Sequence, residues 1–119
     1  MNVISVEIPV KDIERAVKFY GALFNQELKS AEYDGRKYAG IKMADGQVSM
    51  WINQFEGFEP SNNGPLVYLN AGNQFDAMLV RIEQAGGKVV IPRTPMSDTS
   101  VFSTFNDTEG NTLGLYAEV

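Results

Sequence analysis

The stretch Val3-Ile4-Ser5-Val6-Glu7-Ile8-Pro9-Val10, followed closely by Asp12, decides the fold of this chain. Apolar residues alternate in it with Ser5 and Glu7, which is the two-residue period of a half-buried strand. Asp12 stands at the position of a helix N-cap, because its carboxylate can accept hydrogen bonds from backbone N–H groups at the start of a helix. Apolar residues then recur at helical spacing, so the sequence predicts a helix that ends near Asn25.

Three short strands are expected after this helix. They cover residues 27–33, 37–43 and 47–52. Asp34-Gly35 and Asp45-Gly46 separate them, and such pairs suit tight hairpins because glycine adopts positive φ without steric strain. The first half of the chain therefore predicts a strand, a helix and three more strands.

The second half of the chain repeats this order. Residues 54–64 are rich in Gly, Pro, Ser and Asn and predict a linker. A strand at 66–70 then leads to a helix with Asn73 and Asp76 as an approximate capping box, and Gly86-Gly87 ends that helix. The remaining residues predict strands at 88–91, 101–105 and 112–117, a loop at 92–99 and an acidic turn at 107–111.

Two βαβββ modules in a single domain, residues 1–119, follow from this repeat. The modules cover about residues 3–53 and 65–117, and each is too small to bury both faces of its own sheet. We therefore expect an α+β fold in which the modules share a core, with helices outside and a cup-shaped, partly open mixed β-sheet inside. A concave cleft between the modules is the expected place for a small ligand.

The composition argues against several classes of function. The chain has 15 acidic and 10 basic residues, a net charge of −5 and no basic stripe, so a nucleic-acid partner is not expected. It contains no Cys and no His, which leaves no disulfide, zinc ribbon or thiol nucleophile. No run is apolar enough to span a membrane, and Met1-Asn2 leads into a strand rather than into a signal peptide. A cytoplasmic protein without a membrane partner is expected.

Several short motifs occur in order along the chain. They are Ile8-Pro9-Val10-Lys11-Asp12 with Arg15-Ala16 and Phe19-Tyr20, then Val67-Tyr68-Leu69-Asn70, Gly86-Gly87-Lys88-Val89, and Asp107-Thr108-Glu109-Gly110-Asn111. Together they resemble the vicinal oxygen chelate superfamily, the group of glyoxalase I, bleomycin-resistance and extradiol-dioxygenase proteins. More narrowly, the chain resembles small bacterial glyoxalase-like members over about residues 3–116. The resemblance implies the same duplicated βαβββ fold.

The resemblance also implies where a divalent metal would be held. Enzymes of the family place it on four side chains that point into the cup, and the matching positions here are Ser5, Met50, Pro65 and Gly114. These residues cannot supply the nitrogen and oxygen ligands that Zn, Ni, Fe or Mn need. No metal and no other cofactor is therefore expected.

The lining of the cup is extended from these positions by alternation, because every second residue of a strand points to the same face. The expected ligand-binding residues are Ser5, Glu7, Met50, Ile52, Thr112, Gly114 and Tyr116.

Glu7 is the candidate catalytic residue of this set. A carboxylate on an apolar strand is costly to bury unless it is hydrogen-bonded or paired. Either a neighbour such as Tyr116 or Lys42 satisfies it, or it is kept for a ligand.

The same patterns assign other polar and aromatic residues. Trp51 is expected in the core under the first helix, and Asp107 and Glu109 are expected to serve the acidic turn. Three residues could line the mouth of a pocket: Tyr38, Phe102 and Arg93.

Three functions are compatible with this sequence. The first is metal-free binding of a small apolar or aromatic molecule, including cationic ones, in the cup between the modules. The second is a glyoxalase-like lyase or isomerase that acts on a small carbonyl compound with Glu7 as general base. The third is protein association through a vestigial cup. A homodimer is expected in each case, since a sheet of this kind leaves strand edges that a second copy can cover, and the cup could be completed within one chain or by exchanged modules.

Overall fold

The computed structural model describes all 119 residues, and its first half contains the predicted strand, helix and three strands. Strand β1 covers Val6–Pro9, helix α1 Ile13–Phe24, strand β2 Ala31–Tyr33, strand β3 Arg36–Lys42 and strand β4 Val48–Gln54. We call these elements the first module. Strands β1 and β2 are shorter than predicted, because residues 3–5 and 27–30 lie outside any strand.

The second half repeats the pattern with one additional short helix. Strand β5 covers Tyr68–Asn70, the 3-10 helix η1 Gly72–Gln74, helix α2 Phe75–Gln84, strand β6 Lys88–Ser97, strand β7 Ser100–Asn106 and strand β8 Thr112–Glu118. These elements form the second module, and together with the first they confirm the expected α+β class and the βαβββ repeat.

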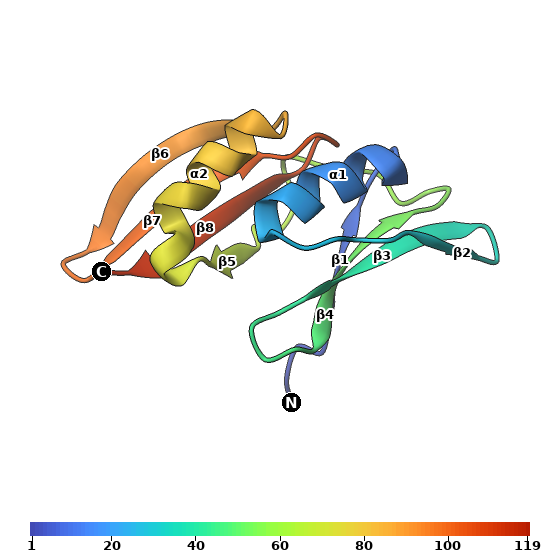
Figure 1. Cartoon of the computed structure of the whole chain (residues 1–119), viewed down its shortest axis with the longest axis horizontal. Helices are drawn as coiled ribbons and strands as arrows, with labels where there is room; N and C mark the ends of the chain where they lie inside the picture. Colours follow the sequence, from blue (N-terminus) through green and yellow to red (C-terminus); the bar gives the residue numbers. More distant parts are fainter.

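Hydrogen bonding divides the strands into two open four-stranded sheets, in the orders β1-β4-β3-β2 and β5-β8-β7-β6. In each sheet the first strand of the module pairs in parallel with the last, and the other neighbours are antiparallel. Figure 1 shows α1 and α2 side by side on one side of the molecule and the two sheets on the other. The two sheets thus have corresponding strand orders, with β1 and β5 as corresponding edges.

Helix α1 begins and ends as the sequence predicts. The Asp12 carboxylate accepts hydrogen bonds from the backbone N–H groups of Glu14 at 3.1 Å and Arg15 at 3.2 Å, which satisfies two donors that the helix cannot pair itself. Asn25 closes the helix with a left-handed φ of 53°, a conformation that asparagine tolerates. Asp34 and Gly35 also both have positive φ, as a tight two-residue hairpin between β2 and β3 requires.

The predicted capping box at the start of α2 is wrong. The N-cap is Gln74, and no side chain caps the helix. The turn of η1 precedes α2 directly, so Asn73 lies inside helical structure. The side-chain oxygen of Asn73 accepts a hydrogen bond from the side-chain amide of Gln74 at 3.4 Å instead of capping the helix. A helical turn that continues into α2 thus occupies the place where a cap would act.

The predicted loop at residues 92–99 is also wrong over most of its length. Strand β6 continues to Ser97 and pairs with β7 through three irregularities in register. Pro92 and Pro95 break the strand pattern in the sequence, but β6 is an edge strand, where a residue without an N–H can face away from the partner. Bulges absorb the remaining mismatch.

A single apolar core joins the two modules, as expected. Phe19 and Tyr20 of α1 are fully buried, and the Phe19 ring lies 6.3 Å from the ring of Phe105 in β7. The core cluster contains 21 buried residues from both modules. Helix α1 therefore packs on the second module as well as on its own sheet. No helix is long and apolar enough to cross a membrane.

Candidate ligand site

The face of each sheet that lies opposite the helices, which we call the inner face, carries polar and aromatic side chains. In the first module Glu7 lies beside Trp51, and Tyr38 beside Asn53. In the second module the register places Tyr68 beside Gly114 and Phe102 beside Tyr116. The residues that alternate with these in β1, β3, β4, β5, β7 and β8 are mostly buried in the core, so the inner faces of these strands remain open to a ligand.

An aromatic ring covers a glycine on the inner face of each module. A β-carbon on Gly40 would approach Cζ3 of Trp51 to 3.0 Å and Cγ1 of Val48 to 2.7 Å. A β-carbon on Gly114 would clash with the ring of Tyr68. Glycine in a strand often marks such a close approach, and here it lets the rings lie flat against the sheet.

Strand β8 places its three predicted site residues on the inner face. Thr112, Gly114 and Tyr116 alternate with core residues, as the sequence predicts. Tyr116 is half-buried opposite Phe102. These positions agree with the predicted orientation, and their binding role stays a prediction.

Strand β4 corrects the prediction for Met50 and Ile52. Both side chains are in the core, 3% and 0% exposed, and Trp51 between them faces inward rather than under α1. The cause is a bulge: Ile41 pairs with Met50 but Lys42 pairs with Val48, so Ser49 is an extra residue on β4. One extra residue moves every later side chain of a strand to the other face.

Glu7 lies on the inner face of β1 with its side chain exposed. The Asn53 side-chain amide on the neighbouring strand β4 donates a hydrogen bond to Oε1 of Glu7, and Oε2 has no protein partner. Neither Tyr116 nor Lys42, the neighbours considered from the sequence, contacts this carboxylate. Asn53 lies one residue beyond the predicted end of its strand, which is why its role was not anticipated.

Glu7 borders a surface hollow that joins the two modules, with a cavity volume of about 470 Å³. We call it the acidic hollow. Its walls come from β1, the linker and the start of β8, and they include two further predicted site residues, Ser5 and Thr112. Phe58 and Glu59 of the linker complete it, and nothing in their local sequence pattern indicated this. Two carboxylates and no Lys or Arg line it.

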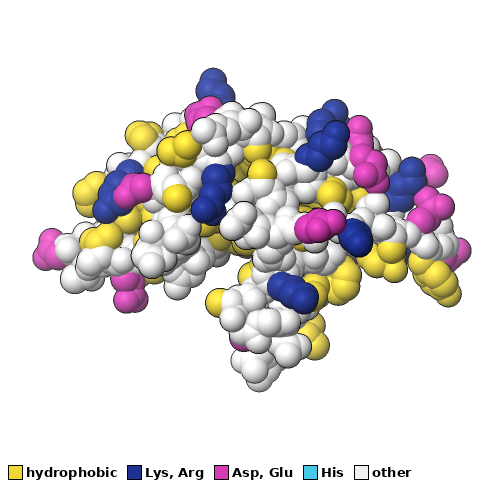
Figure 2. Space-filling view, in the orientation of Figure 1, with side chains coloured by type: hydrophobic (Ala, Val, Ile, Leu, Met, Phe, Trp, Pro, Cys, Tyr) yellow, Lys and Arg dark blue, Asp and Glu magenta, His cyan; other side chains and the backbone are white.

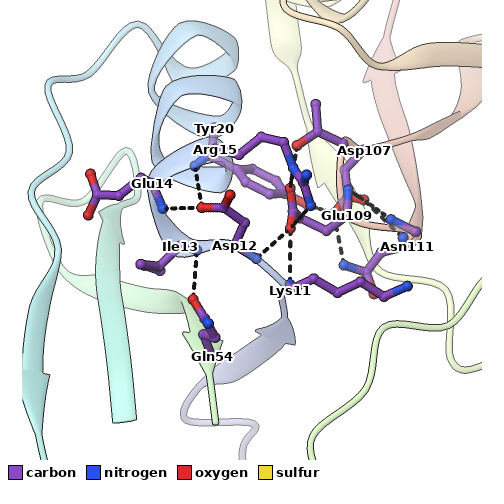
Figure 3. Close-up of polar contacts among 12 residues, drawn as sticks. Lys11, Asp12, Ile13, Glu14, Arg15, Tyr20, Gln54, Asp107, Glu109 and Asn111 are labelled. Atoms are coloured by element: carbon purple, nitrogen blue, oxygen red, sulfur yellow. Dashed lines mark hydrogen bonds and ion pairs between the residues drawn. The ribbon is translucent and has the colours of Figure 1, made fainter.

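A buried polar junction fixes the position of β1 relative to β8 (Figure 3). Glu109 of the acidic turn is 2% exposed, and its Oε1 accepts from the backbone N–H groups of Lys11 at 3.0 Å and Asp12 at 2.9 Å. Arg15 donates to both oxygens, from Nε at 2.7 Å and from Nη2 at 3.0 Å. Glu109 therefore serves the contact between modules rather than the turn itself.

The rest of the junction is built on Asp107. Its Oδ1 accepts from the backbone N–H groups of residues 109, 110 and 111, which confirms the predicted turn. Its Oδ2 accepts from the Tyr20 hydroxyl at 2.6 Å and from the Asn111 amide at 2.8 Å. The Asn111 amide also donates to the Pro9 carbonyl at 2.8 Å, which holds the end of β1.

The pKa values of Glu109 and Tyr20 respond to this junction. Burial of Glu109 opposes its ionisation, but the hydrogen bonds from Arg15, Thr108 and the two backbone N–H groups outweigh it and lower the pKa of Glu109. Burial raises the pKa of Tyr20 well above its ordinary value, and the neighbouring Asp107 charge adds to the effect. Both groups are thus held in the forms they have at neutral pH.

Comparison with known proteins now fixes the family. A family model described as the Glyoxalase/Bleomycin resistance protein/Dioxygenase superfamily matches residues 2–115. The chain belongs to this superfamily. The resemblance inferred from the sequence motifs is therefore confirmed.

Solved structures agree with this assignment. A glyoxalase family protein from Bacillus cereus superposes with a TM-score of 0.77 at 16% identity, over 100% of this chain and 95% of that chain. A genomically encoded fosfomycin resistance protein from Listeria monocytogenes superposes with a TM-score of 0.72 at 19% identity, over 100% of this chain and 94% of that chain. Glyoxalase I from Zea mays superposes with a TM-score of 0.67 at 18% identity, over 96% of this chain and 45% of that chain. These likenesses show the fold. A search of curated proteins found no match.

The side chains at the superfamily's expected metal positions do not fit a transition metal. Ser5 is exposed, Gly114 has no side chain, Met50 points into the core and Pro65 precedes β5 instead of lying in it. The residue that replaces Met50 on the inner face is Trp51, which has no donor atom for a metal. No group of three or more Asp and Glu side chains gathers elsewhere to offer such a site.

The three residues considered for a pocket mouth have different positions. Tyr38 lies on the inner face with its ring centroid 6.0 Å from that of Trp51, and Phe102 lies on the inner face of the second module. Arg93 instead lies against α2, where it pairs with Asp76 at 2.9 Å and covers the ring of Phe75 at 5.6 Å.

Proposed function

We propose that this superfamily member binds a small apolar or aromatic molecule with a cationic group in the acidic hollow, without a metal and without a reaction. The observation that carries the proposal is the Glu7 carboxylate, which is oriented by Asn53 and leaves Oε2 free at the edge of the hollow. The cytoplasmic location, and the lack of a membrane or nucleic-acid partner, stay predictions from the sequence.

The chemistry of the hollow supports this class of ligand. Its volume lies within the range of about 300–1,000 Å³ that is usual for small-molecule sites. Phe58, Val67 and Ile8 give apolar wall, while Glu7 and Glu59 give two negative charges that no basic residue of the hollow neutralises. An ammonium group gains from both charges, and an aromatic body can cover the apolar wall.

Benzylamine is a suitable probe, with benzyl alcohol as its neutral counterpart. Titration of ¹⁵N-labelled protein followed by NMR should place the benzylamine shifts on β1, the linker and the start of β8. Glu7→Gln keeps the shape but removes the charge, and it should weaken benzylamine by about 1–2 kcal/mol. This lies around the lower end of the range of about 1.5–3 kcal/mol for a hydrogen bond to a charged group, because the site is open to solvent. Binding of benzyl alcohol should not change.

Glu27→Gln is the matched control, because it removes the same charge from an exposed residue outside the hollow. It should leave both probes unaffected. Equal weakening of benzylamine by the two substitutions would attribute the effect to net charge and remove Glu7 from the site. Shifts confined to other surfaces would exclude the acidic hollow.

The alternative, a lyase or isomerase acting on a small carbonyl compound with Glu7 as general base, has weaker support. General-base catalysis alone contributes about 10²–10⁴-fold, and no Lys or Arg lines the hollow to stabilise the negative charge of a developing enolate. Exchange of the protons next to the carbonyl of a small ketone into D₂O would test it. Exchange above the buffer rate that disappears in Glu7→Gln would favour the enzyme.

We infer a homodimer as part of this proposal. Val3 and Ile4 precede β1 and are 84% and 89% exposed, and Tyr68 on the inner face is 42% exposed. Exposed apolar groups at β1 and β5, which are edge strands of the two sheets, are commonly covered by association. Sedimentation should give a dimer that Ile4→Glu dissociates, whereas Val80→Glu, a charge added to the exposed face of α2, should not. A wild-type monomer at high micromolar concentration would end this inference.

A further inference from the structure

A second hollow lies between the two modules, with a cavity volume of about 480 Å³. Its walls come from the end of α1, the β3–β4 turn, β5 and α2. Figure 2 looks onto this region, and dark-blue Lys or Arg side chains lie on both sides of the groove between the modules. We call it the basic hollow.

The floor of the basic hollow is apolar. Leu23 of α1, Leu69 of β5 and Met78 of α2 are buried members of the core that reach its surface, and Phe24 and Met43 are half-buried beside them. Such a floor can hold the hydrocarbon part of a ligand, because binding removes apolar surface from water.

The polar residues around this floor carry positive charge only. Lys42 and Arg81 are its charged residues, and its other polar side chains are the amides of Gln26, Asn70 and Gln74 and the hydroxyl of Tyr68. This contrasts with a net charge of −5 for the whole chain and with the two carboxylates of the acidic hollow. A local excess of cations in an acidic protein favours an anion at this place.

Neither cation forms an ion pair. Arg81 donates to neutral acceptors, from Nη1 to the Leu23 carbonyl at 3.4 Å and from Nη2 to Oε1 of Gln74 at 3.1 Å. The backbone of Lys42 is held by the Gln26 side chain, whose amide and carbonyl bond to the Lys42 C=O at 2.8 Å and N–H at 3.2 Å. The two ion pairs of the protein lie elsewhere, between Arg15 and Glu109 and between Arg93 and Asp76.

We propose that the basic hollow binds a small amphipathic carboxylate, with the hydrocarbon chain on the apolar floor and the carboxylate between Lys42 and Arg81. A guanidinium has donors left over after two neutral hydrogen bonds, and its planar fork matches a carboxylate. The site is distinct from the acidic hollow and takes a ligand of opposite charge.

Octanoate is the probe, and 1-octanol is its neutral counterpart with the same chain. Octanoate titrated into ¹⁵N-labelled protein should shift amides of β5, α2 and the end of α1, while 1-octanol should bind more weakly. Arg81→Gln and Lys42→Gln should each weaken octanoate, the first by about tenfold, since a hydrogen bond to a charged group contributes at least about 1.5 kcal/mol. Lys18→Gln removes the same charge from the exposed face of α1 and should leave binding unchanged.

Lys42→Gln guards against a purely structural effect, because the Lys42 side chain makes no hydrogen bond or ion pair whereas Arg81 also holds α1 to α2. Weaker octanoate binding in both variants, with an unchanged melting temperature in Lys42→Gln, supports the site. Equal affinity for octanoate and 1-octanol, or equal binding by the Lys42 and Lys18 variants, would overturn it. Benzylamine binding at the acidic hollow reports separately on the proposed function.

Discussion

Replacement of Glu109 by glutamine tests the reasoning about the junction most directly. In the wild type, five donors point at the two carboxylate oxygens, including Thr108 Oγ1 at 2.8 Å. The glutamine carbonyl can keep the Oε1 bonds to Lys11, Asp12 and Arg15. Its NH₂ group would then face Nε of Arg15, donor against donor, and the charge that Arg15 pairs with would be gone.

The expected loss of stability follows from these contacts. A hydrogen bond to a charged group contributes about 1.5–3 kcal/mol, and removing one partner of a buried ion pair costs about 3–5 kcal/mol. The Glu109 side chain is fully buried but that of Arg15 is 50% exposed, so water can solvate Arg15 after the change. We therefore expect Glu109→Gln to lower the free energy of unfolding by about 2 kcal/mol, which corresponds to roughly 5–10 °C in melting temperature for a chain of this size.

Urea unfolding followed by Trp51 fluorescence, the signal of the only tryptophan, and by circular dichroism would measure this loss. Glu56→Gln is the control, because Glu56 is exposed in the linker and makes no hydrogen bond. A Glu109→Gln variant that unfolds within about 0.5 kcal/mol of the wild type, the range of ordinary surface substitutions, would refute the assignment of Glu109 to the junction.

The pH dependence gives an independent check on the same residue. The folded-state pKa of Glu109 lies below that of the unfolded chain, so its contribution is complete above the unfolded pKa and is lost as the pH falls through the folded pKa. The stability difference between wild type and Glu109→Gln should therefore be constant at neutral pH and shrink in acid. A difference that stays constant down to strongly acidic pH would contradict the lowered pKa.

Three further predictions concern the helix cap, the buried hydroxyl and the inner face. Asp12→Ala should lower the free energy of unfolding by about 1 kcal/mol through loss of the α1 cap, measured by urea unfolding. Tyr20→Phe should lower the free energy of unfolding by about 1–2 kcal/mol at neutral pH, because the hydrogen bond to Asp107 is lost. Burial raises the pKa of Tyr20, so the wild type should lose stability as the pH rises above the ordinary tyrosine pKa, and the variant should lose less. Gly114→Ala should cost about 1–3 kcal/mol by displacing the Tyr68 ring, and less in a Tyr68→Ala background, which a double-mutant cycle of thermal unfolding would show.

Local signals in the sequence predicted the elements whose causes are local. The cap at Asp12, the hairpin at Asp34-Gly35 and the acidic turn at 107–111 each depend on bonds within a few residues, and the structure contains all three. The two failures among the elements, at Asn73 and at residues 92–99, occur where a neighbouring helical turn or a paired strand overrides the local pattern.

The candidate site was harder to predict, because it depends on register. The match to the superfamily's ligand positions placed Met50 on the inner face, but the extra residue Ser49 on β4 turns every side chain that follows to the other face. A bulge of this kind has no signature in a single sequence, since it depends on how β3 and β4 pair. In β8 the pairing with β7 is regular from Thr112 to Glu118, and alternation from the matched position Gly114 gave the correct face for Thr112 and Tyr116.

The junction explains how a turn in the second module can position a carboxylate in the first. Asn111 holds the Pro9 carbonyl at the end of β1, and Glu109 holds the next two backbone N–H groups, so the path of β1 beside the start of β8 is fixed over consecutive residues. Glu7 precedes Pro9 by two residues on the same face, and Thr112 follows Asn111 directly, so both side chains meet at the acidic hollow. The acidic turn, which makes no contact with Glu7 itself, thus determines where the Glu7 carboxylate stands relative to the second module.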